Sequence, residues 1–167
     1  SVLAAGLTPP DAYGPRNGLA PDRQIGVQLF SKRLGNTFGI QYALGIFNGN
    51  GINQLFNDNN STQPVARIEV DYKQHVTLAI NGYSNVRTEG VRPNRLSTNQ
   101  LAYGADLSAH GYGFSGLLAV LGKSSTYSYA GLPKDSALGA LVQVRYFHDE
   151  TGLEGALRGA FYEPSAA

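Results

Sequence analysis

The sequence lacks several residue types, and each shortage narrows what the chain can be. Its 167 residues include no cysteine, which excludes disulfides, thiolate metal sites and cysteine nucleophiles. Methionine is also absent, initiator included, so we expect a processed chain or an excerpt of a longer one. Charged residues make up 15% of the chain, below the roughly 25% of soluble domains. No apolar run approaches the ~18 residues of a membrane helix, so a chain that crosses a bilayer would do so within a closed barrel.

Motifs that carry chemistry are scarce as well. The formal charge of +1, without a basic patch interleaved with aromatics, argues against a nucleic-acid partner. No nucleophile elbow and no glycine-rich phosphate loop occurs, and we expect neither enzyme activity nor a cofactor. His75, His110 and His148 each fall at an expected tight turn, and their spacing gives no reason for them to converge. We therefore expect solvated histidines and no metal site.

What the sequence does have is alternation. Apolar residues hold the even positions from Phe38 to Ile46 and from Ala66 to Tyr72, and the odd positions from Leu101 to Ala109. Successive side chains of a strand point to opposite faces, so patterns of this kind predict about eight strands along the chain. The stretch from Phe114 to Leu121 is apolar at both parities, and the pattern does not separate its two faces.

The expected connections alternate between short and long. Tight turns are expected at Leu34–Asn36, Tyr72–His75, His110–Gly113 and His148–Gly152, and long polar connections at residues 47–64, 84–99 and 124–136. Aromatic residues that share the apolar face of their strands lie next to the tight turns, and other aromatic residues lie toward the long connections. Bacterial outer-membrane barrels combine short periplasmic turns, longer extracellular loops and two aromatic girdles. The sequence therefore predicts an all-β fold, an antiparallel transmembrane β-barrel of outer-membrane type.

Two stretches carry a resemblance to a known family. Ala-Pro-Asp-Arg-Gln-Ile-Gly-Val at 20–27 enters a strand, and Tyr-Ala-Leu-Gly-Ile-Phe-Asn-Gly-Asn-Gly at 42–51 ends one and opens a loop. This region, Ala20 to Gly51, resembles the phosphate-selective porins of the porin O and porin P group, although Gln24 stands where an acid is expected. The resemblance implies a barrel of about sixteen strands in the bacterial outer membrane. It also implies a trimer that passes small anions or other polar solutes.

The expected topology assigns each part of the chain a place. Residues 1–167 would form one barrel segment, with an extracellular loop at 1–23, strands and loops at 24–162, and the start of another loop at 163–167. Both ends would then lie outside the cell, whereas a complete bacterial barrel normally has its termini in the periplasm. We therefore expect this chain to supply about eight of about sixteen strands, with further strands on either side.

In each expected strand, the charged residues that alternate with the apolar ones would point to the opposite face. These charged residues are the candidates for a functional role. They would line the pore as a field of mixed sign that biases which ions pass. These pore-lining candidates are Lys32, Arg67, Glu69, Asp71, Asp106, Arg145, Glu154 and Arg158. Alternatively, they form ion pairs across neighbouring strands and only make the inner wall of the barrel hydrophilic. The alternation also predicts that an arginine is tolerated at position 106.

Three functions remain open at this point. The chain forms the wall of a passive channel for small polar or anionic solutes, in contact with membrane lipid. Alternatively, the barrel is a scaffold or sheath for a partner protein, or the chain is a soluble all-β binding module.

Overall fold

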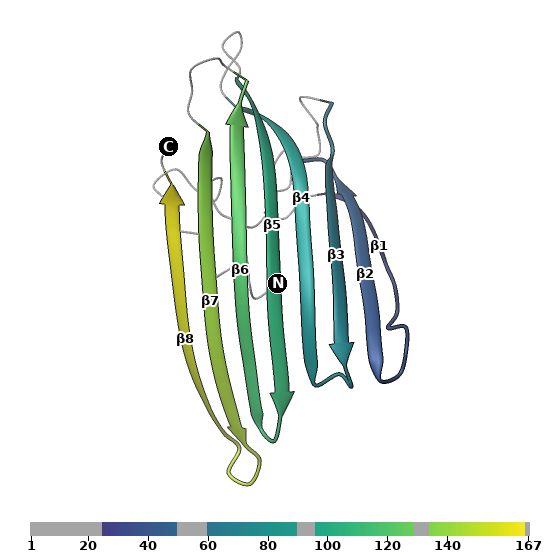
Figure 1. The fold of residues 1–167 in the computed structure, drawn as a ribbon, viewed down its shortest axis with the longest axis vertical. Coiled ribbons are helices and arrows are strands. Elements are labelled where there is room, and N and C mark those ends of the chain that lie inside the picture. The colour runs from purple at the N-terminus through teal and green to yellow at the C-terminus, as the bar shows by residue number, and fades with distance from the viewer. Residues whose placement is uncertain (1–24, 50–59, 90–95, 129–133, 166–167) are drawn as a thin grey trace.

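The computed structural model describes residues 25–49, 60–89, 96–128 and 134–165, which form one antiparallel sheet (Figure 1). The strands are β1 (Gly26–Phe30), β2 (Phe38–Phe47), β3 (Gln63–Tyr72), β4 (Val76–Glu89), β5 (Leu96–Gly111), β6 (Phe114–Tyr127), β7 (Asp135–His148) and β8 (Leu153–Ser165). The all-β class and the eight antiparallel strands are thereby confirmed. Within the described ranges, no helix has the length and apolar character needed to cross a membrane.

The strands are ordered β1 to β8, so each pairs only with its neighbours along the chain. The sheet is open, with β1 and β8 at its two edges. Tight turns gather at one end of the sheet, while the strand ends that adjoin the longer connections lie at the other (Figure 1). Tyr112 and Gly113 both have positive φ, 52° and 80°. This combination defines a type I′ turn, whose twist matches that of the flanking strands.

The register separates the side chains into two faces. The apolar face comprises odd residues of β1, β5 and β8 and even residues of the other five strands. In β3, for example, Val70 pairs with Leu78 of β4, which in turn pairs with Leu107 of β5. The opposite parity makes up the charged face, where Asp71 and Asp106 are buried. The alternation that predicted the strands also predicted which residues share a face.

The part of β6 from Phe114 to Leu121 has apolar residues on both faces of the sheet, and on the charged face it contributes to a small apolar core. Ala119 of β6 and Leu141 of β7 are paired in the register and buried, 2% and 1% exposed. Leu117, Leu121, Ala137 and Tyr162 pack around them. The second apolar set of β6 therefore serves packing across β7 and β8.

Several boundaries expected from the sequence are wrong. β4 continues to Glu89 and β5 begins at Leu96, both within the connection expected at 84–99, and β6 continues to Tyr127, within the connection expected at 124–136. These longer strands pair with their neighbours, and the sequence pattern at their polar ends did not show it.

A loop was also expected to begin at residue 163, but β8 continues to Ser165 and pairs with β7 over Glu163 and Pro164. Proline interrupts a central strand because it cannot donate to the ladder. It is tolerated here because β8 is an edge strand, so one side of its backbone has no neighbouring strand in the sheet.

Candidate functional site

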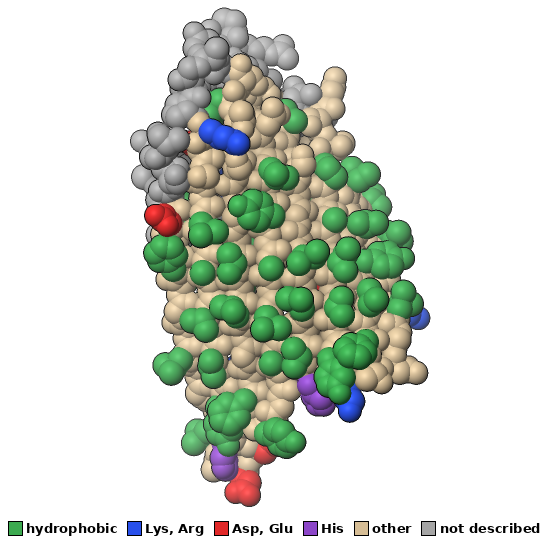
Figure 2. Space-filling model, in the orientation of Figure 1, with side chains coloured by type: hydrophobic (Ala, Val, Ile, Leu, Met, Phe, Trp, Pro, Cys, Tyr) green, Lys and Arg blue, Asp and Glu red, His purple; other side chains and the backbone are tan. Residues whose placement is uncertain are grey.

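The apolar face is the most uniform feature of the molecule. Space-filling Figure 2 shows hydrophobic side chains spread over the face turned toward the viewer, across all parts of the sheet. Exposed large apolar residues include Leu29, Leu44, Ile68, Ile80, Leu101, Leu118, Val142 and Leu157, one from each strand. Among the described strand residues on the apolar face, Glu163 near the end of β8 is the only one that is Asp, Glu, Lys or Arg. A soluble sheet would instead bury such a face or make it polar.

The height of this apolar face can be compared with a bilayer. Phe38 and Ile46, at the two ends of β2, are 8 residues apart on the same face. At ~3.4 Å per residue they span about 27 Å along the strand. For strands tilted by about 40° that becomes about 20 Å along the membrane normal, comparable with the ~25 Å apolar band of outer-membrane barrels.

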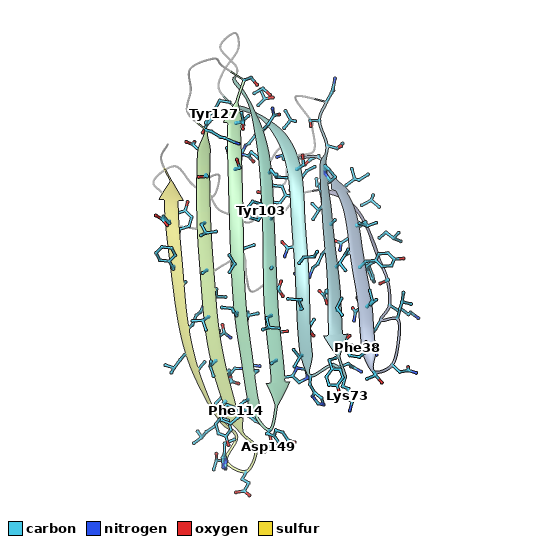
Figure 3. The ribbon with its side chains drawn as sticks, viewed as in Figure 1. Phe38, Lys73, Tyr103, Phe114, Tyr127 and Asp149 are labelled. Atoms are coloured by element: carbon cyan, nitrogen blue, oxygen red, sulfur yellow. The ribbon has the colours of Figure 1, made fainter. Side chains whose placement is uncertain are left out.

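Aromatic rings mark the tight-turn end of the apolar face. The rings of Phe38 and Tyr72 lie 5.1 Å apart between centroids, and those of Phe114 and Tyr146 lie 4.4 Å apart. In Figure 3, Phe38 and Phe114 lie near the turns labelled by Lys73 and Asp149. Tyr103 lies toward the opposite end, with more than half of its surface exposed. The aromatics thus bracket the aliphatic band, as membrane-interface girdles do.

A shallow groove of about 740 Å³ also lies on the apolar face. Its floor is formed by the small residues Ala66 and Gly82, which are paired between β3 and β4, and Leu44, Leu101 and Tyr103 are among the residues around it. A groove lined in this way offers hydrocarbon contacts and almost no hydrogen-bonding groups. It suits an apolar surrounding rather than a polar solute.

On the charged face, Arg33 ties two tight turns together. Its guanidinium forms two hydrogen bonds with Asp71, Nε to Oδ2 at 2.8 Å and Nη2 to Oδ1 at 2.7 Å. It also donates to the carbonyl oxygens of Gly35 and Asn36, while Asp71 accepts from the backbone N–H of Gln74 at 2.9 Å. The hydrogen bonds that Arg33 donates to the Asp71 carboxylate are the main cause that raises the pKa of Arg33. The β1–β2 and β3–β4 turns are therefore held in one hydrogen-bonded cluster.

Gly39 makes room for this cluster. It is paired with Asp71 in the register and buried beneath the ion pair. A Cβ at Gly39 would collide with the side chains of both Arg33 and Asp71. Because those atoms are the ends of flexible side chains, an alanine here displaces the ion pair rather than the backbone.

We therefore predict that Gly39→Ala and Asp71→Asn destabilise the protein non-additively. Each change should lower the urea midpoint of unfolding, and in the Asp71→Asn background Gly39→Ala should cost less, because the pair is already weakened. Gly155→Ala is the matched control, since a Cβ at Gly155 meets nothing within 4 Å. Additive losses would show that Gly39 is required for another reason.

A second ionic cluster spans three strands. Arg67 of β3 bonds to Glu69 through Nε and to Asp106 of β5 through both terminal nitrogens, at 2.7 and 3.0 Å. The contact passes over β4, where Ala79 pairs with both acidic residues in the register and is 1% exposed. The small side chain of Ala79 leaves the space that the longer side chains cross. One cation thus contacts two carboxylates.

The remaining candidates are more open to solvent. Arg145 and Glu154 approach to 3.4 Å with 50% and 48% of their side chains exposed. Arg158 lies on β8 and is exposed, and its parity places it on the charged face. Lys32 is exposed in the connection that follows β1, not in a strand, so the alternation does not fix its direction.

The eight candidates thus fall into several groups. The structure brings Arg67, Glu69 and Asp106 together, joins Asp71 to Arg33, and places Arg145 beside Glu154. Lys32 and Arg158 have no ion-pair partner among the residues that are described. The sequence missed Arg33, because it lies in a turn where no alternation applies, and no motif marks its reach to Asp71.

Two histidines lie closer together than the sequence indicated. The rings of His75 and His110 are 5.6 Å apart between centroids, whereas His148 lies beside Tyr146 and Thr151. The spacing gave no reason for convergence, because it cannot show that the β3–β4 turn is level with the end of β5. Within the described ranges, no three His, Cys, Asp or Glu side chains are grouped to hold a metal ion.

Comparisons of the chain with family models, with curated proteins and with solved structures find no match.

Proposed function

We propose that this chain forms part of the wall of an outer-membrane porin, a passive channel for small polar or anionic solutes. The observation that carries the proposal is the separation of the two faces, since the apolar face is nearly free of charge and all eight strands share it. Such a sheet is stable where one face meets lipid and the other meets water. A soluble binding module would expose a far larger apolar patch than soluble monomers tolerate.

The open edges extend the proposal. In lipid, an unpaired strand edge is not tolerated, so β1 and β8 must pair either with one another or with further strands. An even number of antiparallel strands makes β1 and β8 run in opposite directions, as neighbours in a closed up-and-down barrel require. A barrel of about sixteen strands would leave an aqueous lumen. The resemblance to phosphate-selective porins supports this size and a homo-oligomer, and we propose both.

The charges of the wall point to weak ion selectivity. Arg33 and Asp71 cancel one another, whereas Arg67 compensates one of the two negative charges of Glu69 and Asp106 and leaves the other. Fixed charges that are paired in this way contribute little net field to the lumen. The described part of the wall therefore favours passage of polar solutes of either sign.

The experiment that tests the proposal uses the full-length protein in planar bilayers. We predict single-channel conductance and a stepwise fall in it when Ser108→Cys is treated with a bulky, charged thiol reagent. Leu107→Cys, one residue away on the opposite face, is the control and should leave conductance unchanged. The natural chain contains no cysteine, so each introduced thiol is the only one in this sequence.

A protein that inserts but does not conduct would favour the second candidate, a barrel that acts as the sheath of a partner protein. The partly buried side chains that surround Leu141 on the charged face suit that alternative, because a packed partner would cover the apolar surface that they leave exposed. A protein that stays in the aqueous phase without detergent would contradict both.

A further inference from the structure

His75 and His110 lie opposite one another at the tight-turn end of the sheet. The backbone N–H of His110 donates to the carbonyl oxygen of His75 at 2.8 Å, and the next pair along, Val76 and Ala109, belongs to the β4–β5 ladder. Both side chains are exposed, and their rings are 5.6 Å apart with planes inclined by 60°. The backbone thus holds two imidazoles side by side in water.

This spacing is close to the one that two imidazoles adopt on a single metal ion. A metal–nitrogen bond of about 2.0–2.1 Å places the ion about 3.2 Å from the centre of each ring. With an angle of about 109–120° at a tetrahedral ion, the two ring centres are then about 5.2–5.5 Å apart, and with the 90° of a square-planar ion they are about 4.5 Å apart. The observed 5.6 Å lies just above the tetrahedral range and about 1 Å above the square-planar one, so the two exposed rings need to approach by about 1 Å at most to share an ion.

We propose that His75 and His110 form a binding site for a borderline divalent transition-metal ion, Cu²⁺, Ni²⁺ or Zn²⁺. Neutral imidazole suits these ions, whereas Mg²⁺ and Ca²⁺ require oxygen ligands. Since no third His, Cys, Asp or Glu of the described residues joins the pair, water completes the coordination. The site is independent of the proposed channel, because it needs only the β3–β4 turn and the end of β5.

Binding would link two neighbouring hairpins. His75 ends the β3–β4 turn, and His110 precedes the β5–β6 turn. A metal held by both stabilises the folded state, because the unfolded chain does not keep the two histidines together. The melting temperature should therefore rise with the concentration of CuCl₂ and remain unchanged with MgCl₂.

The test titrates CuCl₂ into the full-length protein, folded in detergent micelles, and follows binding by calorimetry and electron paramagnetic resonance. We expect one ion per chain with the hyperfine pattern of two imidazole nitrogens. His75→Ala and His110→Ala should each weaken binding by about a hundredfold, because the second imidazole acts at a high effective concentration. His148→Ala is the control and should bind as the unchanged protein does.

Circular dichroism of each variant establishes that the sheet is intact. Because both histidines are exposed, neither substitution removes a packed side chain. Binding within about threefold of the original in either single variant would overturn the proposal, as would a spectrum with one nitrogen ligand. Loss of binding in His148→Ala would also overturn it, by assigning the ion to a different turn.

Discussion

Replacing Leu107 with arginine should lower the free energy of unfolding of the full-length protein in a lipid bilayer by about 2–4 kcal/mol. Leu107 lies on the apolar face of β5, 42% exposed, and its register partners are Leu78 and Leu118. In the proposed barrel this position faces acyl chains between the aromatic rings at the two ends of the band. A guanidinium there must leave water or deform the bilayer around it.

The matched control is Ser108→Arg, one residue along the same strand. Ser108 lies on the charged face next to Thr77, where an arginine side chain can extend into water. Its free energy of unfolding should change by no more than about 0.5 kcal/mol, as for ordinary surface substitutions. The measurement is urea unfolding from phospholipid vesicles, and equal losses for both variants would refute the assignment of the faces.

Replacing Arg67 with methionine should cost about 2 kcal/mol of stability, because it removes charge-assisted hydrogen bonds from Asp106 and Glu69. Asp106 is the more sensitive partner, since only 8% of its side chain is exposed and Arg67 provides both of its charged contacts. Methionine preserves most of the length of the side chain but none of its hydrogen bonds. The loss therefore reports the ionic cluster rather than a cavity.

A double-mutant cycle with Asp106→Asn isolates that contact. We expect Arg67→Met and Asp106→Asn to couple by about 1–2 kcal/mol, since both remove the same interaction. Arg145→Ala provides the comparison, because its pair with Glu154 is half exposed and should contribute less than about 1 kcal/mol. If the losses of stability caused by Arg67→Met and Asp106→Asn simply add, the two side chains are coupled as weakly as a solvent-exposed ion pair.

The strands could be predicted from the sequence because their signal is local. Alternation over five to sixteen residues reports which face a side chain occupies, and the register of Val70, Leu78 and Leu107 follows that parity. Contacts between strands carry no such signal. Alternation alone allows an arginine at Asp106, yet this carboxylate is buried beneath Arg67, so Asp106→Arg would place two cations together.

The same limit explains the residues that were missed. Arg33 lies beyond the regular part of β1, and its partner Asp71 is 38 residues away in the sequence. The meeting of His75 and His110 depends on where two turns end along the sheet, which is a matter of strand length and register. Proline and a charge at 163–164 indicate a loop in isolation, but the pairing with β7 makes them the end of an edge strand.

The order of the strands has a consequence for the way the molecule folds. Every ladder joins strands that follow one another in the chain, so the sheet can grow hairpin by hairpin, and each addition closes a single connection. Lengthening a connection adds only about 0.6 kcal/mol per doubling, so even the longer connections slow such steps little. In the proposed barrel, the pairing of the first strand with the last is the one that closes the largest loop. We therefore expect that last pairing, rather than formation of the eight-stranded sheet, to set the rate of assembly.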